Sequence, residues 1–462
     1  MEFVVGILLL LTFFGLAYYC IKGHNLMIGF LIITILWTAL SFLGAAFASP
    51  EFLSTTAFYS NGEPVKAIAI LNKIYQSAPV GWGTTLVNVC WGAWFGRVLM
   101  ETGIASTLIR KTVELGGDKP MVTIALLNIV TAIIFTAMTG AGPVIAIGVI
   151  VLPIMMSLGV PKAIAMFSFM ESVAAGIYLN PVNFTQYRAF FIEIDEMPNF
   201  TLGWYAGKWG YAALVISVVV TTILAGFFLK KSKTSHAWAA QTRGASEQKD
   251  APLYTLILPI VPVVLKIWLD FSVIGGFVIA GFAALFLCGK MKGSFKENCQ
   301  LVNKLYYDGV VDTAPLVGFL LTLPMFNTCA SYASPYFKEV LGGIMPTNEY
   351  VVCALFAALS ILGFFRGPLT LYGCGAATLG VLSAVGHFSV PFLFCVFTIP
   401  ATTVNVGSCI TQSWIAWGLA YTKVESRDYL KLSIPFAYIC SILLYILTAF
   451  TVTGLGPEWF LS

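Results

Sequence analysis

The feature that most constrains this chain is the stretch 119–188, in which apolar segments alternate with helix-breaking residues. The apolar segments cover residues 120–138, 144–158 and 163–179. Gly and Pro interrupt them within Thr139–Pro143 and again at Asn180-Pro181. In a lipid bilayer, irregular backbone survives only where protein buries it or where it lines a water-filled cavity. We therefore predict a re-entrant hairpin over 120–158 and a discontinuous transmembrane helix over 163–190.

The composition is that of an integral membrane protein. Of the 462 residues, 58% are hydrophobic and only 10% are charged, whereas charged residues make up about 25% of soluble proteins. The net charge of +4 is small, and no basic stripe carries interleaved aromatic residues, so nucleic-acid binding is excluded. The ten cysteines form no Cys-x-x-Cys pair and the three histidines stand apart. We therefore expect no metal site and no cofactor.

The two halves of the chain resemble each other, because five short motifs recur in the same order. The motifs pair Asn72–Tyr75 with Asn303–Tyr306, Leu115–Gly117 with Leu341–Gly343, Gly142-Pro143 with Gly367-Pro368, Asn180 with Asn405, and Thr185-Gln186 with Thr411-Gln412. We predict two repeats, 1–229 and 253–462, joined by a linker over 230–252. The second repeat would carry a hairpin over 350–385 and a broken helix over 391–420. If a hairpin makes no net crossing, each half crosses the membrane five times; if its two arms cross as ordinary helices, each half crosses seven times. Both numbers are odd, so the repeats would be inverted.

Positively charged residues assign the two sides of the membrane. Lys230, Lys231 and Lys233 mark the linker as cytoplasmic. The other loops on that side then collect Lys22, Arg110, Lys111, Lys119, Lys162, Lys290, Lys292, Lys296, Lys423, Arg427 and Lys431. This topology places both termini outside, and the first hairpin enters from the cytoplasm. We expect a multi-pass protein of the bacterial inner (plasma) membrane.

Glu171 is the candidate ion-coupling group. It lies in the middle of an apolar segment, where an ionised carboxylate costs several kcal/mol and marks a functional site. A structural Glu satisfied by a neighbouring donor is the alternative.

The two helix breaks are the candidate binding site. They carry neutral donors and acceptors at Asn180, Asn183, Thr403, Asn405 and Ser408. The positive end of each half-helix suits a carboxylate, and the exposed carbonyl groups suit a cation.

The hairpin tips would close the site with small residues that allow a ligand to approach the backbone. The first tip offers Thr139, Gly140, Gly142 and Pro143, and the second offers Arg366, Gly367, Pro368 and Thr370. The Arg366 guanidinium either grips a substrate carboxylate or anchors the chain at the membrane interface. Asp308, Asp312 and the pair Lys266 and Asp270 lie near segment ends, so we interpret them as interface charges. His387 is interpreted as a surface residue. The amphipathic segment 104–115 is predicted to brace the first hairpin.

The hairpins, the Gly-Pro tips, the broken helices with Asn and the basic central linker resemble the ion transporter superfamily, and within it the gluconate permease and citrate symporter families. The resemblance implies secondary transport of a small organic anion, in symport with H⁺ or Na⁺, by a homodimer in the lipid bilayer. It also implies that the substrate sits between the two tips and the two breaks.

The sequence also bears on three other classes of function. A cation/proton antiporter is the alternative, in which Glu171 binds the transported ion and Arg366 is structural. A membrane enzyme is not expected, because the sequence offers no set of nucleophile, base and orienting group. A primary pump is excluded because no Gly-x-x-x-x-Gly-Lys loop is present.

Overall fold

The computed structural model describes residues 2–21, 24–54, 56–60, 63–117, 119–191, 199–232, 250–341, 343, 346–373, 375–385 and 388–455. Most of the linker and His387 therefore lie outside the described residues. The described chain is helical apart from one antiparallel pair of two-residue strands, β1 (Tyr59–Ser60) and β2 (Glu63–Pro64). The predicted all-α architecture is confirmed.

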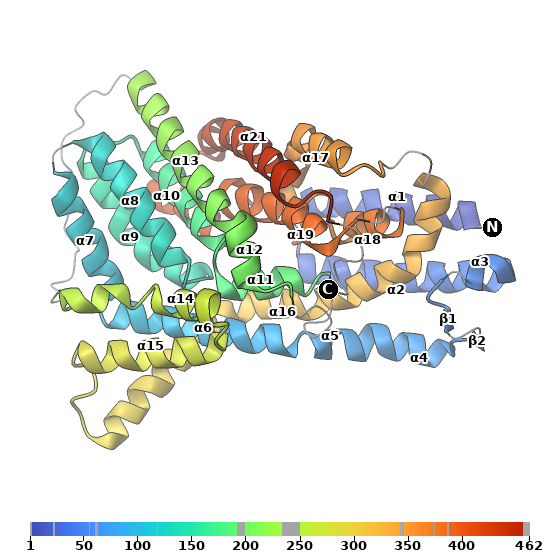
Figure 1. The fold of residues 1–462 in the computed structure, drawn as a ribbon, viewed down its shortest axis with the longest axis horizontal. Coiled ribbons are helices and arrows are strands. Elements are labelled where there is room, and N and C mark those ends of the chain that lie inside the picture. The colour runs from blue at the N-terminus through green and yellow to red at the C-terminus, as the bar shows by residue number, and fades with distance from the viewer. Residues whose placement is uncertain are drawn as a thin grey trace.

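A group of long helices runs along the longest dimension of the molecule (Figure 1). We call it the long-helix group. Its members are α1 (Glu2–Ile21), α2 (Leu26–Phe47), α4 (Ala67–Asn72), η1 (Lys73–Ser77), α5 (Ala78–Gly81), α6 (Gly83–Glu101), α15 (Val273–Leu287) and α16 (Phe295–Leu341). Helix α16 packs against α1, α2 and α6. Its 47 residues give it a length of about 70 Å, more than twice the roughly 30 Å of the hydrocarbon layer.

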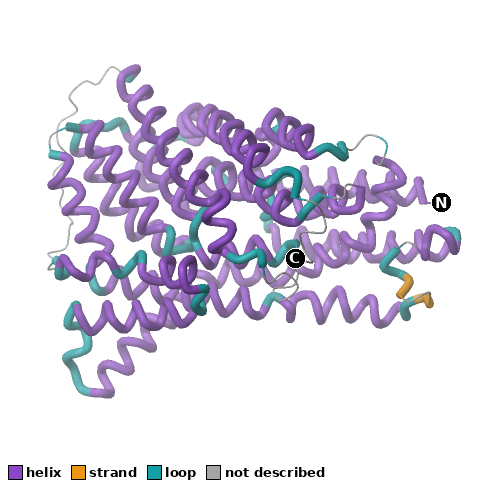
Figure 2. Tube along the Cα trace, in the orientation of Figure 1, coloured by secondary structure: helices purple, strands orange, loops and turns teal. Residues whose placement is uncertain are grey.

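Shorter and interrupted helices form a second group, which we call the broken-helix group. It comprises α8 (Pro120–Phe135), α9 (Ala141–Ser157), α10 (Lys162–Ile177), α11 (Pro181–Arg188), α12 (Leu202–Tyr205), η2 (Ala206–Gly210), α13 (Tyr211–Lys231), α17 (Glu349–Ala358), η4 (Ser360–Arg366), α18 (Gly375–Val385), α19 (Val390–Ile399), η5 (Pro400–Ser408), α20 (Ser413–Thr422) and α21 (Ser426–Thr451). Loops interrupt this group at several points (Figure 2). Helix α10 lies at its centre, in contact with α8, α9, α13, α20, α21 and η5.

The remaining elements are peripheral. They are α3 (Pro50–Ser54), α7 (Ile104–Gly116), η3 (Leu253–Ile257) and α14 (Val261–Leu269). Helix α7 packs against both α8 and α9, as predicted for a segment that braces the first hairpin. Arg110 on α7 also pairs with Asp250 at 2.5 Å, which fixes the far end of the linker onto this helix.

The first hairpin consists of α8 and α9, which have 16 and 17 residues. At 1.5 Å per residue each is about 25 Å long, too short to span the hydrocarbon layer of about 30 Å unless the bilayer thins. Gly140 precedes α9 with φ +96°, a conformation that L side chains rarely adopt. The two helices and the Gly between them lie where the sequence predicts a hairpin, and its re-entrant character remains a prediction.

The first broken helix lies where the sequence predicts it. Helices α10 and α11 meet at an angle of 67° across Tyr178–Asn180. Pro181 begins α11, where its missing N–H group costs nothing.

The second broken helix differs from the expectation. Residues Thr402–Ser408 were expected to be the break. They instead belong to η5, a π-helix with wider turns than an α-helix, which continues α19. Pro400 opens η5, and its ring cannot fit a regular helical turn, so the chain widens instead of bending sharply. Extended backbone follows only at Cys409 and Gln412, with ψ values of 120° and 135°. In this half the sharp bend, 64°, lies instead within the hairpin, between α17 and η4.

Four helices of the described chain are long and apolar enough to cross a membrane, or up to six when each bent pair counts as one span. The order of hairpin, broken helix and long helix recurs in the two halves. The inverted orientation of the repeats and the positions of both termini remain predictions.

Candidate functional site

Glu171 joins the two broken helices. It lies on α10 and is completely buried. Its Oε1 accepts a hydrogen bond from Ser408 Oγ of η5 at 2.7 Å. Its Oε2 has no hydrogen-bond partner among the described residues, and it lies 2.0 Å from the position that a Cβ on Gly407 would occupy. The structure thus places the predicted coupling residue at the predicted second break.

Two further contacts tie the broken helices together. Tyr178 OH lies 2.5 Å from Thr403 Oγ1, and Tyr187 OH lies 3.0 Å from Thr402 Oγ1. Aromatic hydroxyls were not among the predicted site residues. Tyr178 follows the end of α10, and Tyr187 lies within α11. Apart from their nearness to the first break, nothing in the sequence marks either tyrosine as a site residue.

Asn180 holds the first break against the first hairpin tip. Its Oδ1 accepts from the backbone N–H groups of Val182 and Asn183 at 2.9 and 3.2 Å, so it caps α11. Its Nδ2 donates to the carbonyl oxygens of Phe135 and Met138 at 3.1 and 3.0 Å. The side chain therefore fixes the geometry of the break instead of offering free groups to a ligand.

Asn180→Ala is expected to lower the free energy of unfolding by about 2–4 kcal/mol, because it removes a helix cap and leaves two buried carbonyl groups without donors. Thermal unfolding of the purified protein in detergent measures this loss. Asn183→Ala is the matched control, because the Oδ1 of Asn183 has no partner in the described chain. Equal stability of the two variants would contradict the structural role of Asn180.

Several buried polar atoms around the breaks lack a hydrogen-bond partner among the described residues. They are Glu171 Oε2, Asn183 Oδ1, Gln186 Nε2, Thr370 Oγ1, and both Oδ1 and Nδ2 of Asn405. Such groups are rare in folded proteins, since each costs about 1–3 kcal/mol. These atoms lie on α10, α11, η5 and the second tip, and a ligand, an ion or water is needed to complete their hydrogen bonds.

The second hairpin tip has a strained backbone. Phe365 and Arg366 are consecutive residues with positive φ, 54° and 60°, a conformation that costs free energy in residues other than Gly and concentrates at functional sites. Glycine is required beside them, because a Cβ on Gly367 or Gly373 would lie 2.0 Å from a backbone oxygen.

This tip contacts both broken helices through two glutamines. The Arg366 Nη2 donates to Gln412 Oε1 at 2.9 Å, and Tyr372 OH donates to Gln186 Oε1 at 2.7 Å. Gln186 and Gln412 are the matching glutamines of the Thr-Gln motif, so the repeat pattern carried a signal for them. The interfacial alternative for Arg366 is not supported, because its guanidinium binds the second break.

The first hairpin tip rests on the long-helix group. Gly142 adjoins the carboxylate of Asp312, and Pro143 lies against Gly96. Asp312 forms a two-pronged ion pair with Arg97 on α6, with Arg97 Nε to Oδ2 at 2.6 Å and Nη2 to Oδ1 at 2.5 Å. Asp312, which the sequence analysis interpreted as an interface charge, is thus half of an ion pair between two helices, and Arg97 was not among the predicted residues. The pair Lys266 and Asp270 does lie at the surface, 2.6 Å apart.

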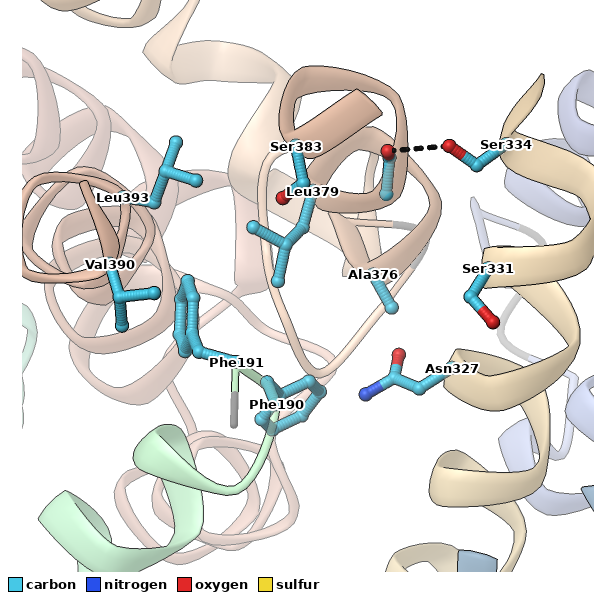
Figure 3. Close-up of a pocket in the computed structure, with 11 residues that line it drawn as sticks. Phe190, Phe191, Asn327, Ser331, Ser334, Ala376, Leu379, Ser383, Val390 and Leu393 are labelled. Atoms are coloured by element: carbon cyan, nitrogen blue, oxygen red, sulfur yellow. Dashed lines mark hydrogen bonds between the residues drawn. The ribbon is translucent and has the colours of Figure 1, made fainter. Parts of the chain in front are cut away.

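A cavity of about 340 Å³ is lined by residues of α16, of α18 in the second hairpin, and of α19. Phe190 and Phe191 approach it from the segment after α11, and Asn327, Ser331 and Ser334 face it from α16 (Figure 3). Ser334 Oγ donates to the carbonyl oxygen of Gly380 on α18 at 3.0 Å. The predicted site residues do not line this cavity.

Within the part of the chain that the structure describes, no three His, Cys, Asp or Glu side chains are grouped as metal ligands. The absence of a cofactor remains an expectation.

No protein-family model and no curated protein matches this chain. Among solved structures, it is similar to the YdaH transporter from Alcanivorax borkumensis, with a TM-score of 0.53 and 14% sequence identity. The match covers 94% of this chain and 100% of that one. At this identity the likeness shows only the fold, an all-α, multi-pass membrane fold. It does not support the narrower resemblance to gluconate permeases and citrate symporters.

Proposed function

We propose that this protein is a secondary active transporter that moves a small organic anion, a sugar acid or a di- or tricarboxylate, across the inner membrane with H⁺ or Na⁺. The substrate would bind between the second tip and the two broken helices, at Asn183, Arg366, Thr370 and Asn405. Glu171 and Ser408 would hold the coupling ion. The proposal includes a homodimer in the membrane, as the resemblance implies.

The observation that carries the proposal is one fully buried carboxylate, Glu171, on the same group of broken helices as several buried polar groups without partners among the described residues. The amide of Asn405 offers a donor and an acceptor, and Thr370 offers a hydroxyl. Glu171 contacts a hydroxyl group instead of a cationic side chain, which leaves it able to take up a proton or a cation. Neutral donors, the Arg366 guanidinium and the N-terminal end of α11 together suit a carboxylate substrate.

The arrangement of the two helix groups is suited to alternating access. Transporters of this general design move one bundle against another around a midplane site. The cavity between α16 and the hairpin arm α18 provides space for such movement.

Uptake into proteoliposomes tests this proposal. Labelled gluconate, citrate or succinate is expected to accumulate against its gradient when a pH or Na⁺ gradient is imposed. Liposomes without protein, and proteoliposomes with the gradients collapsed by ionophores, are the controls. Uptake that only equilibrates the anion would contradict ion coupling.

A cation/proton antiporter is the second candidate, and the buried carboxylate without a basic partner favours it. In that case Glu171 would bind the transported cation, and Arg366 would only hold the second tip against Gln412. Exchange of Na⁺ or K⁺ for H⁺, independent of any organic anion, distinguishes this candidate from the first.

A further inference from the structure

The ion pair between Arg97 and Asp312 is a second charged site, separate from Glu171. Arg97 lies on α6 and Asp312 on α16, both in the long-helix group. Charged residues inside membrane proteins are costly and concentrate along substrate and ion pathways. An ion pair that only tied two helices together would be expected to be fully buried, so the exposure of the two side chains bears on its role.

Neither side chain of the pair is fully buried. The side chain of Arg97 is 29% exposed and that of Asp312 is 15% exposed. The adjoining tip residues Gly140 and Gly142 also keep partial exposure. Glu171, by contrast, is completely buried. Both side chains of the pair therefore keep some surface that faces outside the protein.

The pair is also built into the first hairpin tip. A Cβ on Gly142 would lie 2.2 Å from Asp312 Oδ2, so only glycine lets the carboxylate come this close. Gly142 belongs to the first turn of α9, where the partial positive charge of the helix end favours an anion. The Asp312 carboxylate thus occupies a place defined by a guanidinium fork and by the start of a 17-residue helix.

We propose that Arg97 is a receptor for a carboxylate group of the transported anion, and that Asp312 fills its place while the substrate is absent. This inference rests on the proposed transport of an organic anion. A substrate carboxylate has the same shape and charge as that of Asp312, so it can accept the same two hydrogen bonds from Arg97. One guanidinium–carboxylate pair breaks as another forms, and the Asp312 carboxylate turns to the accessible space that it already borders.

The exchange would couple substrate binding at Arg97 to movement of the first hairpin. When Asp312 leaves Arg97, its contact with Gly142 is also lost, and the tip loses a contact to the long-helix group. Substrate binding would thereby release the broken-helix group for movement. Arg97 would act first on the substrate, and the polar groups at the breaks would receive it afterwards.

The test measures carboxylate binding by Asp312→Asn, which removes the internal competitor and keeps the side-chain shape. Binding of acetate, succinate, citrate and gluconate is measured by calorimetry on the detergent-purified full chain at fixed pH and ionic strength. The best ligand of the four is expected to bind at least about 10-fold more tightly to Asp312→Asn than to the wild type. Arg97→Lys keeps the charge but loses the fork, and should bind it at least about 10-fold more weakly.

Two further variants serve as a control and as a substitute for Asp312→Asn. Asp270→Asn removes one partner of the exposed Lys266 and Asp270 pair on α14, and its affinity should equal that of the wild type. Gly142→Ala keeps both charges but forces the Asp312 carboxylate away from Arg97, so this variant should also bind the carboxylate ligand more tightly than the wild type. If Asp312→Asn does not fold, the affinity of Gly142→Ala tests the same exchange.

The possible results separate the two proposals. Unchanged or weaker binding by Asp312→Asn, with wild-type affinity in Arg97→Lys, would assign the pair a purely structural role and overturn this inference. If the wild type nevertheless accumulates an anion in proteoliposomes, the proposed function stands. Failure of every variant to bind or transport any of the four carboxylates would overturn both.

Discussion

Glu171→Gln is expected to abolish the accumulation of substrate against its gradient, with uptake driven by a pH or Na⁺ gradient falling by about 100-fold or more. The amide is close in shape to the carboxylate, and its oxygen can still accept the hydrogen bond from Ser408 Oγ. The fold should therefore survive, while the group can no longer take up a proton or hold a cation by charge. The measurement is gradient-driven uptake into proteoliposomes.

Counterflow of labelled for unlabelled substrate is the accompanying measurement for Glu171→Gln. If Glu171 serves coupling and not substrate binding, exchange should persist when accumulation is lost. Wild-type accumulation by Glu171→Gln would remove Glu171 from the coupling mechanism and leave its burial as a structural feature.

Gly407→Ala is the second substitution with a large expected effect. A Cβ at this position would lie 2.0 Å from Glu171 Oε2 and 2.9 Å from its carboxyl carbon. Since η5 and α10 are both tightly packed, the carboxylate must move, and overpacking of this kind costs about 1–3 kcal/mol. Transport should fall by about 10- to 100-fold, because the added methyl group displaces the coupling residue from Ser408.

Gly207→Ala is the matched control for Gly407→Ala. Gly207 also lies in a wide helical segment, η2, but an added Cβ there would meet nothing within 4 Å. Its transport rate should match that of the wild type. Equal activity of the two variants would show that the close approach of Gly407 to Glu171 is not needed for transport.

The features that the sequence predicts well are local. Asn180-Pro181 is a cap followed by the residue that best tolerates the first helical position, so the break follows from the chemistry of two neighbouring residues. Gly140 likewise marks the first tip, because a positive φ favours glycine. Glu171 stands out because a carboxylate within an apolar segment is costly wherever that segment packs.

The second break was not placed correctly, because several outcomes are open to the same residues. Pro, Gly, Thr and Asn in Thr402–Ser408 permit an extended break, but they also permit the wide turns of η5. The packing of η5 against α10, η4 and α21 stabilises the helical outcome. Local propensity alone does not separate the two.

Arg97 and Asp312 show the limit of sequence reasoning most clearly. They are 215 positions apart in the chain. In the sequence, each resembles an ordinary charge near the end of an apolar segment. Only the packing of α6 against α16 makes them a pair, and only the first hairpin adds Gly142 to it. The same holds for Tyr178 and Thr403, which are 225 positions apart.

The sequence by itself determined a helical membrane protein, the position of the first hairpin and of the first break, and the presence of one buried carboxylate. These features depend on the length of the apolar segments, on Pro and Gly at their ends, and on the cost of burying a charge, all of which act within a few residues. The tertiary structure decided which polar groups surround that carboxylate, the shape of the second broken helix, and the pairing of Arg97 with Asp312. Those outcomes depend on which helix faces meet, and helix packing brings together residues whose spacing along the chain carries no record of the contact.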